Sequence, residues 1–141
     1  MTVIGPVHED HGAAFGERGG RRVVRNFGRP EREQRAVRNV VGLIEMAYGV
    51  VVVEGADRVD YVDNVVSNRV PAADGEGTYA LVLDPQGGVE TDMYVYNAGE
   101  RLLLFTPPQR AADLAEDWSE KVFIEDVEIR EATDDFAIFG V

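Results

Sequence analysis

Apolar residues recur along the chain with spacings that change from one segment to the next, and each spacing predicts a type of element. Recurrence every three to four residues predicts helices over residues 57–66 and 107–122. A further helix-like stretch is expected over residues 31–39, directly after Pro30. Alternating or unbroken apolar runs predict strands over residues 40–46, 49–54, 78–84, 89–96, 101–106, 122–129 and 136–139. Because strands follow one another in runs, the pattern favours an α+β fold, an antiparallel sheet with helices on one face.

Prolines, glycines and capping residues set the expected boundaries. Pro30 is placed to open the first predicted helix, and Thr106 is expected to cap the last one, with Pro107 as its first residue. Residues 1–34 show no periodicity and carry several glycines among scattered charges. We therefore predict a poorly ordered N-terminal arm over residues 1–34, followed by one folded domain over residues 35–141.

Two successive strands, joined by the turn-forming residues Pro85–Gly88, form a predicted hairpin. If the loop consists of those four residues, the alternation of side chains places Tyr79 opposite Tyr94, with Asp92 on the same face. A carboxylate beside two phenols suits a flat, polar heteroaromatic ligand, because rings stack on tyrosine and the acid accepts N–H donors. The same residues also fit an ordinary solvated sheet face, on which paired tyrosines stabilise neighbouring strands.

The charge balance narrows the classes of partner. Lys and Arg number 14 and Asp and Glu number 26, so the net charge is 14 − 26 = −12. This balance argues against binding to nucleic acid and against adsorption to an anionic membrane, since both rely on clustered basic residues. Lys121 is the single lysine, and an acidic chain with so little lysine is typical of a salt-rich cytoplasm, where screening weakens self-repulsion.

The absence of cysteine excludes disulfides, thiolate metal sites and a thiol nucleophile within this chain. No apolar run approaches the length that spans a bilayer, and no signal segment is recognisable, so we expect a cytoplasmic protein. His8 and His11 flank two acidic residues, but they lack the spacing of a helical zinc motif, and we expect surface histidines and no metal. The glycine-rich stretch 16–22 lacks the Lys-Ser/Thr ending of a phosphate loop.

Three stretches, in order, carry a resemblance to a known family: AVRNVVGLIEMAYGVVVVEGADRVDYVDNVVSNRV, GEGTYALVLDPQGGVETDMYVY and DDFAIFGV. From about Arg35 to the end, the chain resembles the N-terminal half of the folate-binding aminomethyltransferase family, that of the glycine cleavage T-protein. The first stretch is similar to the family's opening strand, helix and "tND" loop. The second is similar to its "GG-v-D-D" hairpin, and the third to a strand that continues into Gly-Pro.

The resemblance implies roles for individual residues. Asp92 matches the family's catalytic Asp, which lies beside the reactive nitrogens of tetrahydrofolate. Tyr79 matches a Tyr that lines the folate site, and Tyr94 would hold the ring system with it. Asn68 matches the Asn of the "tND" loop. In this role Asp92 would hold a folate N–H and stabilise positive charge near the transferred carbon.

The chain also departs from the family pattern. Glu45-Met46-Ala47 stands where the family has Asp-x-Ser, Arg69 replaces the Asp that follows the loop Asn, and Thr91 replaces the first Asp of the hairpin pair. The family's C-terminal half, which completes the folate site, has no counterpart in these 141 residues.

What the resemblance implies is a tetrahydrofolate-dependent aminomethyltransferase of the glycine cleavage T-protein type, or a fragment of one. It would transfer an aminomethyl group from a lipoyl carrier protein to a folate nitrogen and release ammonia. Two alternatives remain open: a non-catalytic folate-binding module that supports iron–sulfur proteins, and an interaction subunit whose last strand docks on a partner by edge pairing. We expect a partner chain or self-association.

Overall fold

The computed structural model describes residues 3–141, and these residues divide into two compact units. The larger unit comprises Gly49–Thr133. The smaller unit comprises the chain up to Tyr48 together with Asp134–Val141.

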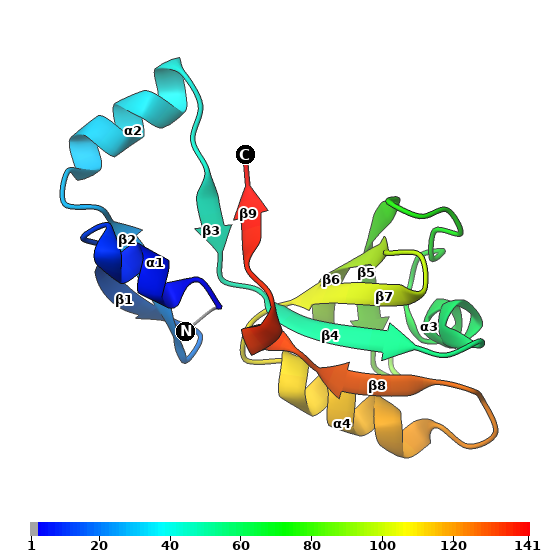
Figure 1. The fold of residues 1–141 in the computed structure, drawn as a ribbon. Helices are drawn as coiled ribbons and strands as arrows, with labels where there is room; N and C mark the ends of the chain where they lie inside the picture. Colours follow the sequence, from blue (N-terminus) through cyan, green and yellow to red (C-terminus); the bar gives the residue numbers. More distant parts are fainter. Residues whose placement is uncertain (1–2) are drawn as a thin grey trace. The chain divides into compact units, whose positions relative to one another are not determined.

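The larger unit is built on a five-stranded antiparallel sheet, shown in Figure 1. The strands occur in the spatial order β5-β6-β7-β4-β8. Their bounds are Gly49–Glu54 for β4, Gly77–Leu83 for β5, Val89–Asn97 for β6, Arg101–Thr106 for β7 and Glu128–Glu131 for β8. Two helices complete this unit, α3 (Arg58–Val65) and α4 (Ala111–Lys121).

One face of the sheet packs against both helices and forms the core. Side chains from every strand, among them Val53 and Leu104, meet Val62 of α3 and Leu114 and Trp118 of α4 in one buried cluster. Burying a side chain of this size stabilises the fold by roughly 1.5–3 kcal/mol. The predicted α+β fold, an antiparallel sheet with helices on one face, is therefore confirmed.

Strand β4 differs from its neighbours because it is buried on both faces. Val51 and Val53 point into the helix-covered core, whereas Val50 and Val52 point to the opposite face and are also fully buried. A strand buried on both sides has no reason to alternate polar and apolar residues. This explains the unbroken run of four valines at residues 50–53.

The smaller unit contains regular elements where a poorly ordered arm was expected. Its elements are α1 (Gly5–Asp10), β1 (Ala14–Arg18), β2 (Arg21–Asn26), α2 (Pro30–Asn39), β3 (Ile44–Met46), the 3-10 turn η1 (Thr133–Asp135), which begins on the last residue of the larger unit, and β9 (Ile138–Gly140). The expectation of an arm without regular structure was wrong. Strands β1 and β2 form a hairpin through Gly19 and Gly20, both at positive φ, and arginines in β2 conceal the apolar pattern of a strand.

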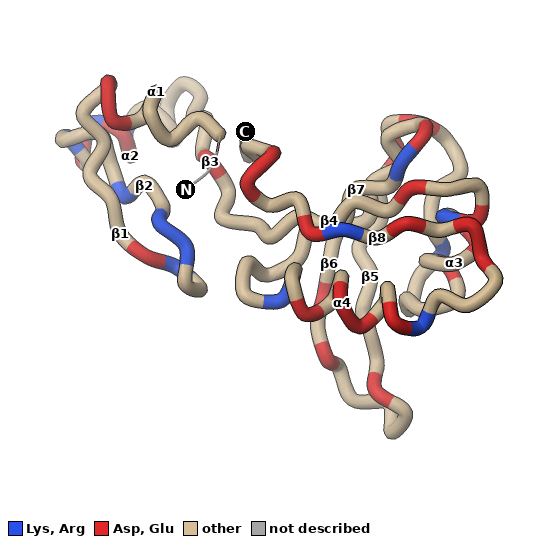
Figure 2. The backbone as a smooth tube through the Cα atoms, turned by 60° about the horizontal axis from the view of Figure 1, so that its bottom comes forward, with Lys and Arg blue, Asp and Glu red and all other residues tan. Residues whose placement is uncertain are grey.

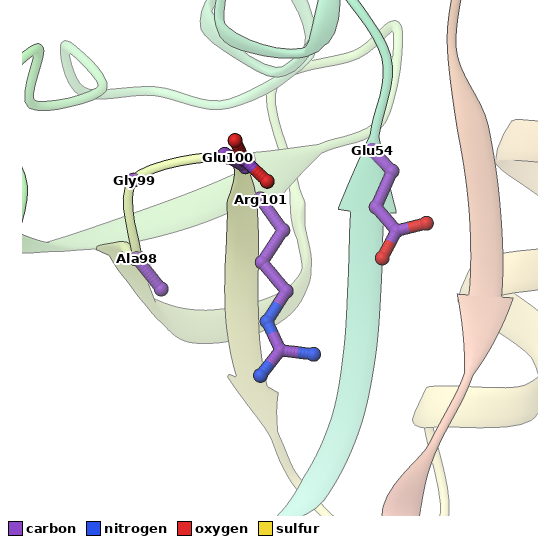
Figure 3. A pocket seen from close by; sticks show the side chains of 5 residues that line it. All are labelled: Glu54, Ala98, Gly99, Glu100 and Arg101. Atoms are coloured by element: carbon purple, nitrogen blue, oxygen red, sulfur yellow. The ribbon is translucent and has the colours of Figure 1, made fainter.

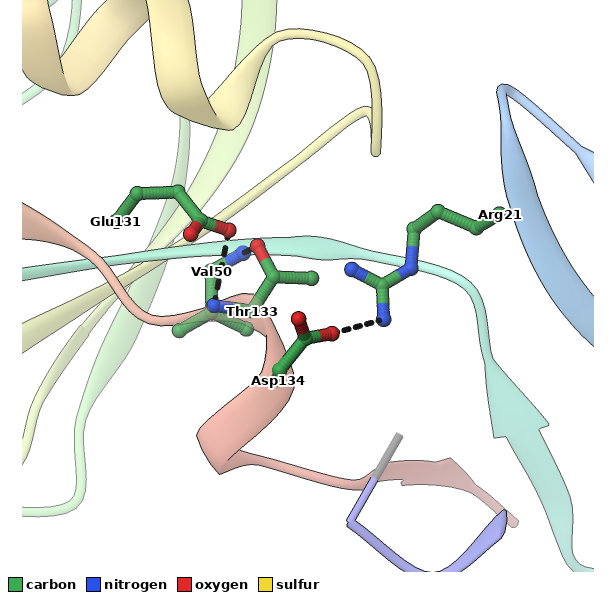
Figure 4. Close-up of polar contacts among 5 residues, drawn as sticks. All are labelled: Arg21, Val50, Glu131, Thr133 and Asp134. Atoms are coloured by element: carbon green, nitrogen blue, oxygen red, sulfur yellow. Dashed lines mark hydrogen bonds and ion pairs between the residues drawn. The ribbon is translucent and has the colours of Figure 1, made fainter. Parts of the chain in front are cut away.

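Thr133 and Asp134 are neighbours in the sequence, but each bonds to residues of a different unit (Figure 4). In the larger unit, the hydroxyl of Thr133 accepts the Val50 N–H at 3.1 Å, and the Thr133 N–H donates to Glu131 Oε1 at 3.0 Å. In the smaller unit, Arg21 Nη2 pairs with Asp134 Oδ1 at 3.5 Å. Strand β9 then pairs antiparallel with β3, so each unit secures its own part of this segment.

Two predicted boundaries in the larger unit are corrected. Helix α4 begins at Ala111 rather than at Pro107, and Arg110, not Thr106, occupies the N-cap position. The reason is that Pro107 precedes Pro108, and a residue before proline is disfavoured in helical conformation. Residues 122–127 form a turn and β8 begins only at Glu128, because the side chain of Glu125 accepts the backbone N–H groups of Phe123 and Ile124.

Among residues 3–141, no helix is long and apolar enough to cross a membrane.

Candidate functional site

The β5–β6 hairpin has the register that the turn residues predict over most of its length. Tyr79 pairs with Tyr94, and Leu81 pairs with Asp92. Near the loop the register shifts by one residue, so that Leu83 pairs with Val89. This bulge lies beyond the site residues and leaves their shared face unchanged.

Asp92 and Tyr79 meet on the face of the sheet that the helices do not cover. The Tyr79 hydroxyl donates to Asp92 Oδ2 at 2.8 Å, and the rings of Tyr79 and Tyr94 lie 5.2 Å apart at an angle of 56°. Tyr79 is 47% exposed and Tyr94 39% exposed, so both rings are accessible from solvent. The carboxylate has further lone pairs with which to accept N–H donors.

The hydrogen bond also favours the neutral form of Tyr79. Its pKa is raised above the ordinary tyrosine value, chiefly because the phenolic O–H donates a hydrogen bond to the Asp92 carboxylate, with smaller contributions from desolvation and from the charge of Asp92. Tyr79 is therefore a neutral donor at physiological pH, and it holds the Asp92 carboxylate in place for a second donor.

The open face continues through two aromatic residues that are not among the predicted site residues. Tyr96 and Phe105, on neighbouring strands, have ring centroids 5.1 Å apart, and Tyr96 is 37% exposed. A side chain at Gly77 would collide with the Tyr96 ring, so this glycine lets the ring lie across the edge strand β5. We call Tyr79, Asp92, Tyr94, Tyr96 and Phe105 the open tyrosine face.

Asn68 lies beside this face but its side chain is engaged with the protein. Its amide nitrogen donates to the Thr78 hydroxyl at 3.0 Å and to the Tyr79 carbonyl at 3.2 Å. Ser67 supports the same junction, because its hydroxyl accepts the Leu81 N–H at 2.9 Å. In this structure Asn68 therefore fixes the loop after α3 to β5, next to the backbone of Tyr79.

The two histidines have different environments. The expectation of surface histidines was wrong for His8, whose side chain is 12% exposed and whose Nε2 lies 2.5 Å from Glu45 Oε2 within the smaller unit. The ring of His8 also contacts that of Phe27, with centroids 5.7 Å apart. Glu45 is the residue that stands in place of the family's aspartate in Asp-x-Ser. No group of three or more potential metal ligands occurs among residues 3–141.

A separate open cavity of 640 Å³ lies at the end of the larger unit where β6 turns into β7. It is lined by Glu54, Ala98, Gly99, Glu100 and Arg101 (Figure 3). Arg58 fixes this turn by donating to the carbonyl oxygen of Gly99 at 2.6 Å and to that of Gly55 at 2.9 Å. The cavity has no aromatic lining and contains none of the predicted site residues, so the open tyrosine face is the better candidate site.

Comparison with known proteins shows the family. The sequence profile described as "GCVT N-terminal domain" matches residues 4–141. The chain belongs to this family. The match begins well before Arg35, so it includes the α1–β1–β2 segment, which lies within the predicted arm of residues 1–34.

Individual relatives agree with the family match. The chain is 27% identical to an aminomethyltransferase of Saccharopolyspora erythraea, over all of this chain and 39% of the relative. It is 28% identical to an aminomethyltransferase of Bacillus subtilis, over 99% of this chain and 39% of the relative. The chain therefore spans about two fifths of the length of the curated relatives it matches.

A solved structure shows the same fold. The glycine cleavage system aminomethyltransferase T of Bartonella henselae superposes with a TM-score of 0.76 at 20% identity, covering 91% of this chain and 37% of that chain. The likeness extends over the GCVT N-terminal domain and supports the arrangement of strands and helices described above.

Proposed function

We propose that this chain is the folate-binding N-terminal part of a tetrahydrofolate-dependent aminomethyltransferase of the glycine cleavage T-protein type. The observation that carries the proposal is the 2.8 Å bond between the Tyr79 hydroxyl and Asp92 Oδ2 on an exposed aromatic face. Two sequence features, a hairpin register and a family resemblance, point to the same pair of residues. The aminomethyltransferases among the relatives support the reaction class.

This combination of one carboxylate and two aromatic rings fits a reduced pterin. A flat ring with N–H donors needs a carboxylate at its edge and apolar or aromatic surface against its face, and Asp92 with Tyr79 and Tyr94 offers that combination. Tetrahydrofolate would supply the nitrogen that accepts the one-carbon unit. Asp92 would hold a ring N–H and stabilise positive charge near the transferred carbon, while the tyrosines orient the ring system.

The aminomethyl donor would be a lipoyl carrier protein, as the resemblance to the glycine cleavage T-protein implies. Because this chain spans two fifths of its relatives, it would hold only part of the folate site, and transfer would need the remaining part in the same or another chain. Binding of the pterin ring is the step that these 141 residues are equipped to perform.

The proposal is tested by binding. Anaerobic titration of the chain with tetrahydrofolate, followed by tyrosine and tryptophan fluorescence, should give a saturable signal. Asp92→Asn should weaken binding about tenfold, because the ligand loses one charge-assisted hydrogen bond, and Tyr79→Phe should also weaken it, because Asp92 loses the bond that positions it. Glu116→Gln, an exposed carboxylate on α4, is the matched control and should bind as the parent does. Equal binding by all variants, or none by the folded parent, would refute the proposal.

A further inference from the structure

The turn between α4 and β8 carries two large apolar side chains in nearly full contact with solvent. Phe123 is 90% exposed and Ile124 is 83% exposed, whereas Val122 and Val127 on either side pack against the core. The turn follows α4, on the helix-covered side of the sheet, and so it is no part of the open tyrosine face (Figure 1). Adjacent exposed apolar residues of this size are typical of an interaction site.

The backbone of this apolar pair is held rigidly by one carboxylate. Glu125 Oε2 accepts the N–H of Phe123 at 2.9 Å and that of Ile124 at 3.2 Å. These bonds lower the pKa of Glu125, so it is ionised and bound at neutral pH. The two apolar side chains therefore project from a fixed turn, and docking them costs little conformational entropy.

The base of the turn is tied to the segment that follows β4. Asp126 donates its N–H to Asp57 Oδ2 at 2.8 Å and accepts the Ala56 N–H through its own Oδ2 at 3.1 Å. Its carbonyl also accepts the Asp57 N–H at 3.1 Å. These three hydrogen bonds hold the turn against residues 56 and 57 of the larger unit.

An acidic hollow of 400 Å³ lies directly beside the apolar pair. It is lined by Asp57, Asp60, Tyr61, Asn64, Val65, Lys121 and Glu125. Three carboxylates against one ammonium give the hollow a negative charge, and Figure 2 shows further acidic residues along α4. A basic side chain of a partner would be attracted here.

We propose that Phe123, Ile124 and this acidic hollow form a docking surface for a partner protein whose binding segment combines apolar residues with a neighbouring arginine or lysine. The charge complementarity selects such a partner over a second copy meeting face to face, because two acidic hollows repel one another. The rigid turn supplies the anchor residues, and the hollow supplies orientation and specificity. This surface is independent of the proposed folate site, which lies on the other face of the sheet.

The test uses peptides selected from a displayed random library against the full 141-residue chain. Selected peptides should combine apolar residues with a neighbouring arginine or lysine. Their affinity, measured by fluorescence anisotropy, should fall at least tenfold for the double variant Phe123→Ser/Ile124→Ser and about threefold for Asp60→Asn. Val89→Ser, which changes another exposed apolar residue, is the matched control and should bind like the parent.

Two outcomes would overturn the proposal. One is a set of selected peptides that bind the parent and the double variant equally, or that carry no basic residue. The other is a dimer of the parent in sedimentation velocity that the double variant abolishes, which would assign the surface to a second copy. Circular dichroism of each variant should match the parent, because Phe123, Ile124 and Asp60 are not among the buried core residues.

Discussion

At the scale of single residues, the candidate site depends on one hydrogen bond between two side chains of neighbouring strands. The positions of Tyr79 and Asp92 could be predicted from the sequence, because alternation along two strands and the length of one turn are sufficient to place them on one face. The same alternation places Tyr96 on this face, but its contact with Phe105 could not be predicted, since it depends on the pairing of β6 with β7 and on the space above Gly77. Neither feature has a local signal in the sequence.

The hydrogen bond makes a prediction about the titration of Tyr79. Its raised pKa is due first to the bond to Asp92, so replacing Asp92 by Asn should bring the pKa of Tyr79 back towards about 10, the ordinary tyrosine value. Ultraviolet difference titration of the parent against Tyr79→Phe isolates this group, and the same subtraction is made in the Asp92→Asn background.

The sign of the pH effect follows from the direction of the shift. Because the folded-state pKa is raised, the stabilisation by this bond is complete below the unfolded tyrosine pKa and is lost as pH rises through the folded-state value. A Tyr79 titration that is the same with and without the Asp92 carboxylate would contradict the bond as the cause.

At the scale of elements, the sequence was most informative where turn residues and periodicity agree, as in β7 and the β5–β6 hairpin. It failed where a side chain binds the backbone locally. Residues 122–127 have the composition of a strand, yet Glu125 bonds to the N–H groups that a strand would use for pairing. Likewise, the sequence of β2 lacks the apolar alternation of a strand because it contains three arginines. The long aliphatic part of an arginine side chain can cover apolar surface, which a hydrophobicity pattern does not register.

Gly55, directly after β4, tests whether close packing against the α4–β8 turn constrains the larger unit. Gly55 has φ +108°, and a side chain there would collide with the Asp126 carbonyl, whereas Gly75 has φ +84° with open space around it. Gly75→Ala should therefore cost only backbone strain, roughly 1–3 kcal/mol. Gly55→Ala should cost clearly more, because the turn that carries Asp126 must also move.

Denaturant unfolding followed by Trp118 fluorescence measures both variants, since this buried indole lies on α4, in the helix-covered core. Gly75→Ala is the matched control, because it shares the positive φ and lacks the collision. Equal losses of unfolding free energy in the two variants would show that the contact between Gly55 and the α4–β8 turn does not constrain the larger unit.

At the scale of the whole molecule, charge is distributed unequally between the two units. Residues 49–133 contain 6 basic and 18 acidic residues, a net charge of 6 − 18 = −12, whereas the remainder contains 8 of each. The total could be read from the composition, but its concentration in one unit could not, because the smaller unit combines the two ends of the chain. Figure 2 shows the acidic residues along α4 and the turn that follows it.

This distribution predicts that salt stabilises the larger unit. Asp113, Glu116, Asp117 and Glu120 repeat like charges at three- and four-residue intervals on α4, and each such pair destabilises a helix by about 0.2–0.5 kcal/mol. Raising potassium chloride from low to molar concentration screens this repulsion, so the midpoint of thermal unfolding should rise.

The triple variant Glu116→Gln/Asp117→Asn/Glu120→Gln should unfold at a higher temperature than the parent in low salt and respond less to added salt. Because general salt effects on apolar burial act on both proteins alike, the difference between their salt responses isolates the electrostatic contribution. Parallel responses in parent and variant would contradict the role assigned to the acidic surface of α4.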